Sequence, residues 1–464
     1  MRTTFILFLF SLFTLTTQAN QYALSEAKKI ALSNATIIDG TGIAPQLNQT
    51  LLIENGKIVL IQDSGVDIPP DYEIKKLDGK TITPGFVMMH EHMFYPTGLG
   101  NYTEMVHSFP KLYLAGGATT IRTAGTTAPY ADLNLQQGIA EKKLVGPDMD
   151  VTAPYLNGPG LPILKIKALR GEGNARDMVN YWLSEGVSSY KLYMHIRRNE
   201  MKTIIDLAHE NKQKVTGHLC SITFREATDL GIDNLEHGFV AATDFVQDKQ
   251  ADACPSSRDT MQSLLELDEN DPRMISLIQH LVKNKVAITS TLTIYETFAK
   301  GRPVAYPEAV ELMNEQVKHQ YLDRWSKIQA SESDNWSRLL KKEMAWEKAF
   351  VEAGGHLMVG TDPTGYGGVI AGWSNIRAIE LLVEAGFTLP HAIKLASLNG
   401  AIFLGQHDSI GSIEVGKRAN LAVFDGDLTK NIADVRKIIW SIKDGVIYDS
   451  KAIFKAMEGK VGLH

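Results

Sequence analysis

The chain has 464 residues, of which 44% are hydrophobic and 22% are charged. This length suits one large folded domain with a smaller attachment, and the composition is that of an ordinary globular protein. The formal net charge of −6 gives no reason to expect a nucleic acid as partner.

The N-terminus has the pattern of a secretory signal. Arg2 precedes an apolar run over residues 5–13, and Thr17 and Ala19 place small residues before a cleavage point after Ala19. The run is shorter than the ~20 apolar residues that a membrane span needs. We therefore predict a signal peptide over 1–19 and an exported protein, periplasmic or secreted, with no membrane anchor after cleavage.

Both ends of the mature chain contain strand patterns. Residues 31–39 and 50–60 alternate as strands, and Asn55-Gly56 marks a tight turn inside the second run. Residues 419–424 and 438–447 match them near the C-terminus. Neither half has enough strands to be stable alone, so we predict one small β-sandwich domain built from 20–83 and 408–464.

The region between these ends, residues 84–407, alternates strands with helical patterns. Eight strand segments can be identified there, at 86–92, 119–122, 149–152, 189–193, 215–218, 234–237, 286–291 and 357–362. Eight strands alternating with helices predict an α/β fold, a parallel sheet closed into a (β/α)₈ TIM-like barrel. The longest gap predicts a helical insertion near 296–350, either a lid over the barrel mouth or a long surface helix.

Six side chains fall where these predicted strands end. His90 and His92 are two residues apart and so point to the same face of a strand. The full set is His90, His92, Lys191, His218, His237 and Asp362. Side chains at the carboxyl ends of barrel strands meet in one mouth. Four histidines and a carboxylate there suit Zn²⁺ or a similar divalent ion.

Lys191 needs a separate explanation, because an ammonium group only donates hydrogen bonds and cannot ligate a metal. Addition of CO₂ to the amine would give a carbamate whose two oxygens could bridge two cations. The alternative is an unmodified lysine held by a neighbouring acid.

The chain has two cysteines, Cys220 and Cys254. An even pair in an exported protein suggests a disulfide, and two free buried thiols are the alternative.

Other residues near the strand ends could contact a substrate. His195, Arg197 and Arg198 could form a carboxylate-binding patch, or they could be solvated basic residues that open the next helix. Tyr295 could face the pocket and polarise a carbonyl, or it could pack in the core.

The motifs at these strand ends resemble the amidohydrolase superfamily. They comprise Pro84-Gly85 through His92, Lys191 in its Tyr-Lys-Leu-Tyr context, Gly217-His218, the Glu236-His237-Gly238 run, Gly360-Thr361-Asp362, and the closing segment 411–424. The branch that the chain resembles contains imidazolonepropionase-related enzymes and metal-dependent Xaa-Pro (prolidase-like) dipeptidases. The resemblance covers nearly the whole mature chain.

The resemblance implies a binuclear centre with a defined set of ligands. His90, His92 and Asp362 would hold the first ion, His218 and His237 the second, and carboxylated Lys191 would bridge two divalent ions, with Zn²⁺ the expected metal. A hydroxide between the metals would be the nucleophile. Asp362 would be the catalytic residue that takes its proton and delivers it to the leaving nitrogen.

The chain departs from the branch in three loops. It has His218-Leu-Cys-Ser221 where the branch has His-x-His-Gly. After Lys191 it has residues 194–198, Met-His-Ile-Arg-Arg, where the branch has Ser/Thr and glycines. It has Arg122-Thr123 where the branch has Arg-Asp. These loops shape the pocket, so the family's substrates do not transfer directly.

The predicted function is metal-dependent hydrolysis of amide (C–N) bonds in a small-molecule substrate, with dipeptides or N-acyl amino acids favoured. One alternative is the same site acting on lactones, carbamates or phosphoesters. Another is a non-catalytic binding protein with the same fold. The sequence leaves open whether the protein is a monomer or a homo-oligomer.

Overall fold

The computed structural model describes residues 21–98, 101–161 and 163–463. The predicted signal peptide, residues 1–19, lies outside the described residues. Among the helices of the described part, none combines the length and apolar character that crossing a membrane requires.

Eight parallel strands, in hydrogen-bonded sheets of three and five strands, form a barrel. They are β7 (Phe86–Glu91), β10 (Ala118–Thr123), β11 (Asp148–Asp150), β12 (Ser189–Leu192), β13 (Lys214–Gly217), β14 (Asn234–Glu236), β15 (Ala287–Ser290) and β16 (Leu357–Val359). Each strand lies where the sequence predicted one. Their side chains are buried almost throughout, as expected for a parallel sheet covered on both faces.

Backbone hydrogen bonds at two seams close the barrel between its two sheet segments. Ala153 N donates to Ser189 O at 2.9 Å and joins the end of β11 to β12, and Asp362 N donates to His90 O at 3.0 Å and joins β16 to β7. Gly360 makes the second contact possible, since a Cβ there would lie 2.3 Å from the Cβ of His90. The predicted barrel is therefore confirmed, and its closure brings the first and last strands side by side.

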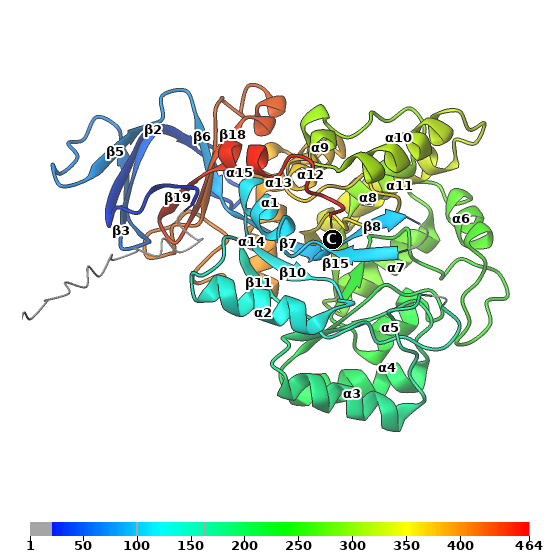
Figure 1. Ribbon diagram of the computed structural model, residues 1–464. Helices are drawn as coiled ribbons and strands as arrows, with labels where there is room; N and C mark the ends of the chain where they lie inside the picture. Colours follow the sequence, from blue (N-terminus) through cyan, green and yellow to red (C-terminus); the bar gives the residue numbers. More distant parts are fainter. Residues whose placement is uncertain (1–20, 99–100, 162, 464) are drawn as a thin grey trace, which may run out of the picture.

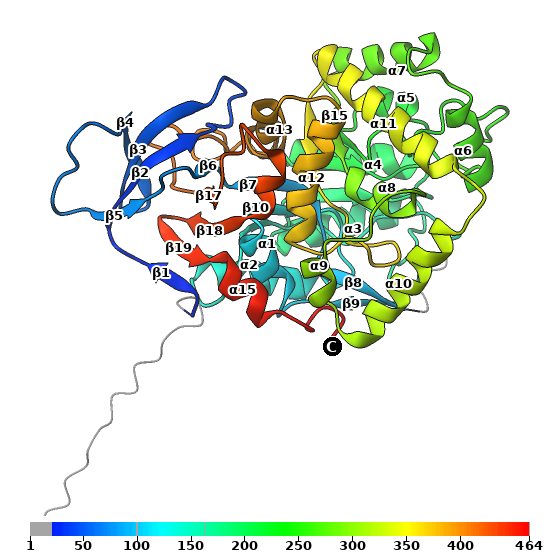
Figure 2. The same cartoon turned by 90° about the horizontal axis from the view of Figure 1, so that it is seen from above.

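Helices surround the barrel (Figures 1 and 2). They are α1 (Phe109–Ala115), α2 (Pro129–Ala140), α3 (Glu172–Ser184), α4 (Arg198–Glu210), α5 (Phe224–Leu230), α6 (Ser257–Leu265), α7 (Pro272–Lys283), α12 (Trp373–Glu384), α13 (Leu389–Ala396) and α14 (Leu398–Phe403). Local sequence sets their ends. At α5, the Thr223 side chain accepts from Glu226 N, and Gly231 ends the helix with a φ of 97°.

The predicted insertion is helical. Between β15 and β16 the chain forms α8 (Leu292–Phe298), α9 (Pro307–Glu311), α10 (Glu315–Gln329) and α11 (Asn335–Glu352). α11 packs against α8, and α10 lies against the hairpin of β8 (Phe94–Gly98) and β9 (Asn101–Glu104) (Figure 2). These helices are thus packed onto elements that border the barrel mouth.

Both ends of the chain contribute to a second, nine-stranded sheet. Its strands are β1 (Ala23–Ser25), β2 (Lys29–Ile37), β3 (Gln46–Glu54), β4 (Lys57–Asp63), β5 (Glu73–Lys76), β6 (Thr81–Pro84), β17 (Leu421–Phe424), β18 (Ile438–Lys443) and β19 (Val446–Asp449). The two halves meet at β6 and β17, which pair antiparallel. A 3₁₀ helix, η2 (Ile432–Arg436), and α15 (Ser450–Ala456) complete the C-terminal part. The two halves of the predicted sandwich are therefore hydrogen-bonded parts of one sheet.

Candidate metal centre

The six predicted ligand residues line one cavity at the carboxyl ends of the barrel strands. The cavity has an empty volume of about 520 Å³. Its lining includes His90, His92, Lys191, His218, His237 and Asp362. These residues lie on β7, β12, β13, β14 and β16 or within three residues after them, so the strand series places residues far apart in sequence around one space.

His90, His92 and Asp362 form the tightest group. Their candidate ligand atoms all lie within 4.8 Å of one another. Oδ1 of Asp362 is 3.3 Å from Nε2 of His92 and 3.8 Å from Nε2 of His90. Asp362 has a φ of 54°, in the left-handed region that non-glycine residues seldom occupy. This conformation turns its carboxylate toward the two histidines, and strain of this kind is often found at functional sites.

His218 and His237 lie directly beside this group. The ring centroids of His218 and His237 are 4.4 Å apart, and those of His237 and His90 are also 4.4 Å apart. His237 has a φ of 69°. The four imidazoles thus form a continuous cluster, with the Asp362 carboxylate 3.7 Å from Nδ1 of His237.

Each of three imidazoles is oriented by a partner at its second nitrogen. Nδ1 of His90 is 2.7 Å from Oε2 of Glu236, Nδ1 of His92 is 3.1 Å from the carbonyl oxygen of Gly125, and Nδ1 of His237 is 3.0 Å from Oγ1 of Thr291. Such partners fix the ring orientation and tautomer of metal-binding histidines. The Nε2 atoms are left available for ligation.

Burial keeps three of the four imidazoles neutral. It lowers the pKa of His90 to about 4 and that of His218 to about 3, and it holds the pKa of His237 well below its usual value. Burial acts to raise the pKa of Asp362, but the hydrogen bond from His92 and the electrostatic interactions with His90, His237 and His92 together outweigh it and keep this pKa below its usual range. At neutral pH the site therefore offers imidazole lone pairs and an ionised carboxylate, which are the donors that Zn²⁺ binds.

Lys191 is the group in the site whose donors are not satisfied. Its side chain is 1% exposed, and Nζ, 3.3 Å from Oε1 of Glu236, has no hydrogen-bond partner among the described residues. Burial lowers the pKa of the Lys191 amine to about 8. The amine is thus buried beside both the cavity and the Glu236 carboxylate, and a perturbed amine in such a cavity is a candidate functional group.

Glu236 and Arg122 form a buried network behind the cavity that sequence reasoning missed. One guanidinium nitrogen of Arg122, on β10, donates to Oε1 of Glu236 at 3.2 Å, and the other donates to Oγ1 of Thr216 at 2.9 Å. Burial acts to raise the pKa of Glu236, but the charges of Lys191, His90 and Arg122 outweigh it and hold this pKa well below its usual value. The available signal was a charged residue inside a buried strand, which requires a partner.

The predicted carboxylate-binding patch does not line the cavity. The Arg197 guanidinium donates to the Glu200 carboxylate, and the Arg198 guanidinium donates to that of Glu226. Both arginines stand at the start of α4, where these acids reach them. The two arginines are therefore the helix-opening basic residues of the alternative interpretation.

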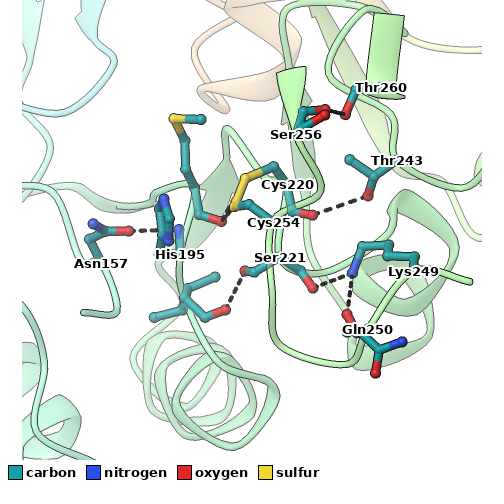
Figure 3. Close-up of a disulfide and its surroundings, with 12 residues drawn as sticks. Asn157, His195, Cys220, Ser221, Thr243, Lys249, Gln250, Cys254, Ser256 and Thr260 are labelled. Atoms are coloured by element: carbon teal, nitrogen blue, oxygen red, sulfur yellow. Dashed lines mark hydrogen bonds between the residues drawn. A yellow bond between two sulfur atoms is a disulfide. The ribbon is translucent and has the colours of Figure 1, made fainter. Parts of the chain in front are cut away.

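His195 and Tyr295 are also absent from the cavity's described lining. The backbone N–H of His195 donates to Oδ1 of Asn157 at 2.8 Å, and its ring lies beside the two cysteines (Figure 3). Tyr295 stacks on Trp336 with ring centroids 5.8 Å apart, and its ring is 6.3 Å from that of His237. Tyr295 therefore belongs to the packing behind the site.

Cys220 and Cys254 form a disulfide (Figure 3). Their Cα atoms are 4.9 Å apart, and both sulfurs lie near the carbonyl oxygen of Met194. The bridge thus links the segment after β13 to the segment before α6, next to the chain that follows β12. It holds together three connections on the mouth side of the barrel.

Replacing Cys220 and Cys254 with serine should lower the free energy of unfolding by about 2–4 kcal/mol, because the bridge closes a loop with a sequence separation of 34. Urea unfolding of the double variant tests this. Reducing agent should lower the stability of the wild type toward that of the variant and leave the variant unchanged. Equal unfolding midpoints for the wild type and the variant would contradict it.

Comparisons with known proteins agree with this geometry. The family model for the amidohydrolase family matches residues 81–449. Dihydroorotases from Syntrophus aciditrophicus and Listeria monocytogenes are 33% and 34% identical over 105 and 101 residues, 22% of this chain in each case. The matched stretch spans 24% and 22% of those relatives, so less than a quarter of their length is covered.

Solved structures share the fold over nearly the whole chain. A Xaa-Pro dipeptidase with bound methionine has a TM-score of 0.68 at 17% identity, covering 91% of this chain and 100% of its own. Bottromycin amidohydrolase has a TM-score of 0.70 at 18% identity, with 93% and 91% covered. An ochratoxinase from A. niger has a TM-score of 0.64 at 17% identity, with 92% and 96% covered. The resemblance read from the strand-end motifs is confirmed: this chain belongs to the amidohydrolase family.

Proposed function

We propose that this protein is an exported, binuclear metal-dependent hydrolase that cleaves amide (C–N) bonds in small molecules. One observation carries the proposal: four imidazoles, an ionised carboxylate and a buried lysine amine converge on one cavity at the barrel mouth. This set has enough ligand atoms for two divalent cations, and Zn²⁺ suits nitrogen and oxygen ligands of this kind.

The residues divide between two ion positions. His90, His92 and Asp362 would hold one ion, and His218 and His237 the other. Bound there, the ions would supply a nucleophile at neutral pH from water and would polarise the substrate carbonyl.

Asp362 would transfer a proton from the attacking water to the leaving nitrogen. Its carboxylate is ionised and faces the cavity, within 3.3–3.8 Å of His90 and His92. A carboxylate in this position can take a proton from the attacking water and pass it to the leaving nitrogen, which must be protonated to depart as an amine.

Lys191 would serve as a carbamate. A pKa of about 8 leaves part of the amine neutral near pH 7, and only the neutral amine can add CO₂. The new N–C bond forms as the nitrogen releases a proton to solvent, and the product is an anion with two oxygens. Mass spectrometry of the native protein should show the mass of one added CO₂, which Lys191→Met would abolish. An unmodified mass at saturating bicarbonate and metal would contradict it.

Export is supported by two features. The N-terminal residues have the pattern of a secretory signal, and the Cys220–Cys254 disulfide suits an oxidising compartment. Detection of the mature chain, starting at residue 20, outside the cytoplasm of the native cell tests this. A protein found only in the cytoplasm with residues 1–19 still attached would contradict it.

Metal-replete protein should hydrolyse amides, and chelation should lower that activity at least about 100-fold, because activation of water depends on the ions. Dipeptides and N-acyl amino acids are the first amides to test, since the solved neighbours include a Xaa-Pro dipeptidase. Lactones, carbamates and phosphoesters belong in the same screen. Zn²⁺ added back should restore turnover. Amide turnover that survives complete removal of metal would contradict the proposal.

A further inference from the structure

The cavity has an arc of aromatic rings along one wall. Successive ring centroids are separated by 5.3, 4.5, 6.2, 4.7 and 5.1 Å. In order, the rings are those of Tyr102, Phe94, His92, Tyr155, Tyr193 and His218, and all six residues line the cavity. The arc therefore runs from the β8–β9 hairpin, past a proposed ligand of the first ion, to a proposed ligand of the second.

The loop that follows β11 adds aliphatic surface. Ile163 and Ile166 line the same cavity. Ring faces and alkyl groups on the walls of a small cavity favour a substrate group that is flat or aliphatic, since such a group gains both buried area and ring contacts there. The polar groups that would fix its orientation are at the metal centre.

Three cationic side chains near the mouth are held by other groups. Lys165, between the two isoleucines, donates from Nζ to the carbonyl oxygen of Tyr102 at 2.7 Å and lies 3.8 Å from the Glu104 carboxylate. Arg197 and Arg198 are held by Glu200 and Glu226. Among the lining residues in the described part of the chain there is one lysine, Lys191, and no arginine, and Lys191 belongs to the metal centre.

Acidic groups stand near this wall instead. Asp362 faces the cavity, and Thr127, another lining residue, donates to the Glu104 carboxylate at 2.9 Å. A free carboxylate on the substrate would lose water contacts between the aromatic rings, and no guanidinium among the lining residues would replace those contacts.

We propose that the cavity selects amides whose group beside the scissile bond is uncharged and aromatic or aliphatic, and that it disfavours those carrying a free carboxylate there. This rests on the proposed amide hydrolysis and narrows its substrate class. Dipeptides and N-acyl amino acids, which carry a free carboxylate beside the scissile bond, would then be poorer substrates than matched amides without it.

A matched pair of substrates tests the selection. N-acetylphenethylamine and N-acetylphenylalanine share the acyl group and the phenyl ring and differ only by the carboxylate. With metal-replete protein, kcat/KM should be at least about tenfold higher for N-acetylphenethylamine, within the range that one pocket contact can discriminate. Equal values, or a preference for N-acetylphenylalanine, would overturn the proposal.

A variant can reverse the selection. Ile166 is partly exposed on a loop, so Ile166→Arg should fold and place a guanidinium at the cavity wall. The ratio of the two kcat/KM values should shift at least about tenfold toward the carboxylate, as expected for a charge-assisted contact. The neutral control Ile166→Gln should leave the ratio within about threefold. A shift as large in the glutamine variant would overturn the charge argument.

Measurements of binding distinguish a failure of this selection from a failure of the proposed amide hydrolysis. If neither amide is hydrolysed by metal-replete protein, the proposed hydrolysis of such amides fails, and calorimetry on the intact amides then decides the selection. Tighter binding of N-acetylphenethylamine than of N-acetylphenylalanine would uphold it. Tighter binding of the carboxylate, or no binding of either, would overturn it.

Discussion

Asp362→Asn should reduce kcat for amide hydrolysis by about 10²–10⁴-fold, the range for loss of a general acid–base group. The carboxamide has almost the same shape but cannot take a proton from water at neutral pH. Kinetics on the best amide substrate, together with thermal unfolding, measure the effect on activity and on the fold.

The fold should survive this change. Asparagine tolerates the left-handed φ of 54° at this position, and the backbone N–H that donates to His90 O is retained. The control is Asp408→Asn, which removes the charge of a 97% exposed side chain and should leave kcat unchanged. Turnover by Asp362→Asn equal to that of the wild type would remove Asp362 from the mechanism.

Glu236→Gln should lower the free energy of unfolding by about 3–5 kcal/mol, because the fully buried Arg122 guanidinium loses its carboxylate partner. It should also weaken zinc binding about 10–100-fold, since Glu236 orients His90 through a 2.7 Å contact to Nδ1. Urea unfolding of the metal-free protein measures the first effect, and competition with a chelator measures the second.

The matched control for this variant is Glu458→Gln. Glu458 is a surface acid with a 46% exposed side chain, and it pairs with Lys455. It should change stability by no more than about 0.5 kcal/mol and leave zinc affinity unchanged. If Glu236→Gln binds zinc as tightly as the wild type, Glu236 does not position His90, even if the variant is less stable.

Sequence patterns were sufficient to predict the barrel because each parallel strand is a short buried run of residues that ends at polar residues. The runs ending near His90 and Asp362 were readable one by one, and the fold class then fixed where their ends meet. Strands β1, β5 and β6, each of three or four residues, were missed, because such short strands are stabilised by pairing with distant partners rather than by their own pattern.

The surroundings of the metal centre were harder to predict. The Arg122–Glu236 pair joins β10 and β14 across the barrel interior, a contact that local periodicity does not encode. The prediction of a carboxylate-binding patch at Arg197 was wrong for a local reason, because Glu200 lies within reach of Arg197 at the start of the same helix. Phe94 and Tyr102 enter the cavity on the β8–β9 hairpin, which interrupts the strand–helix alternation.

Two divalent cations should bind among six residues at one rim of the barrel. Anomalous diffraction from crystals of zinc-loaded protein tests this most directly. We expect two zinc peaks, one within ligand distance of His90, His92 and Asp362 and the other of His218 and His237, with Lys191 between them. Zinc bound elsewhere, or no peak at this cavity in zinc-saturated crystals, would contradict a binuclear centre at this rim.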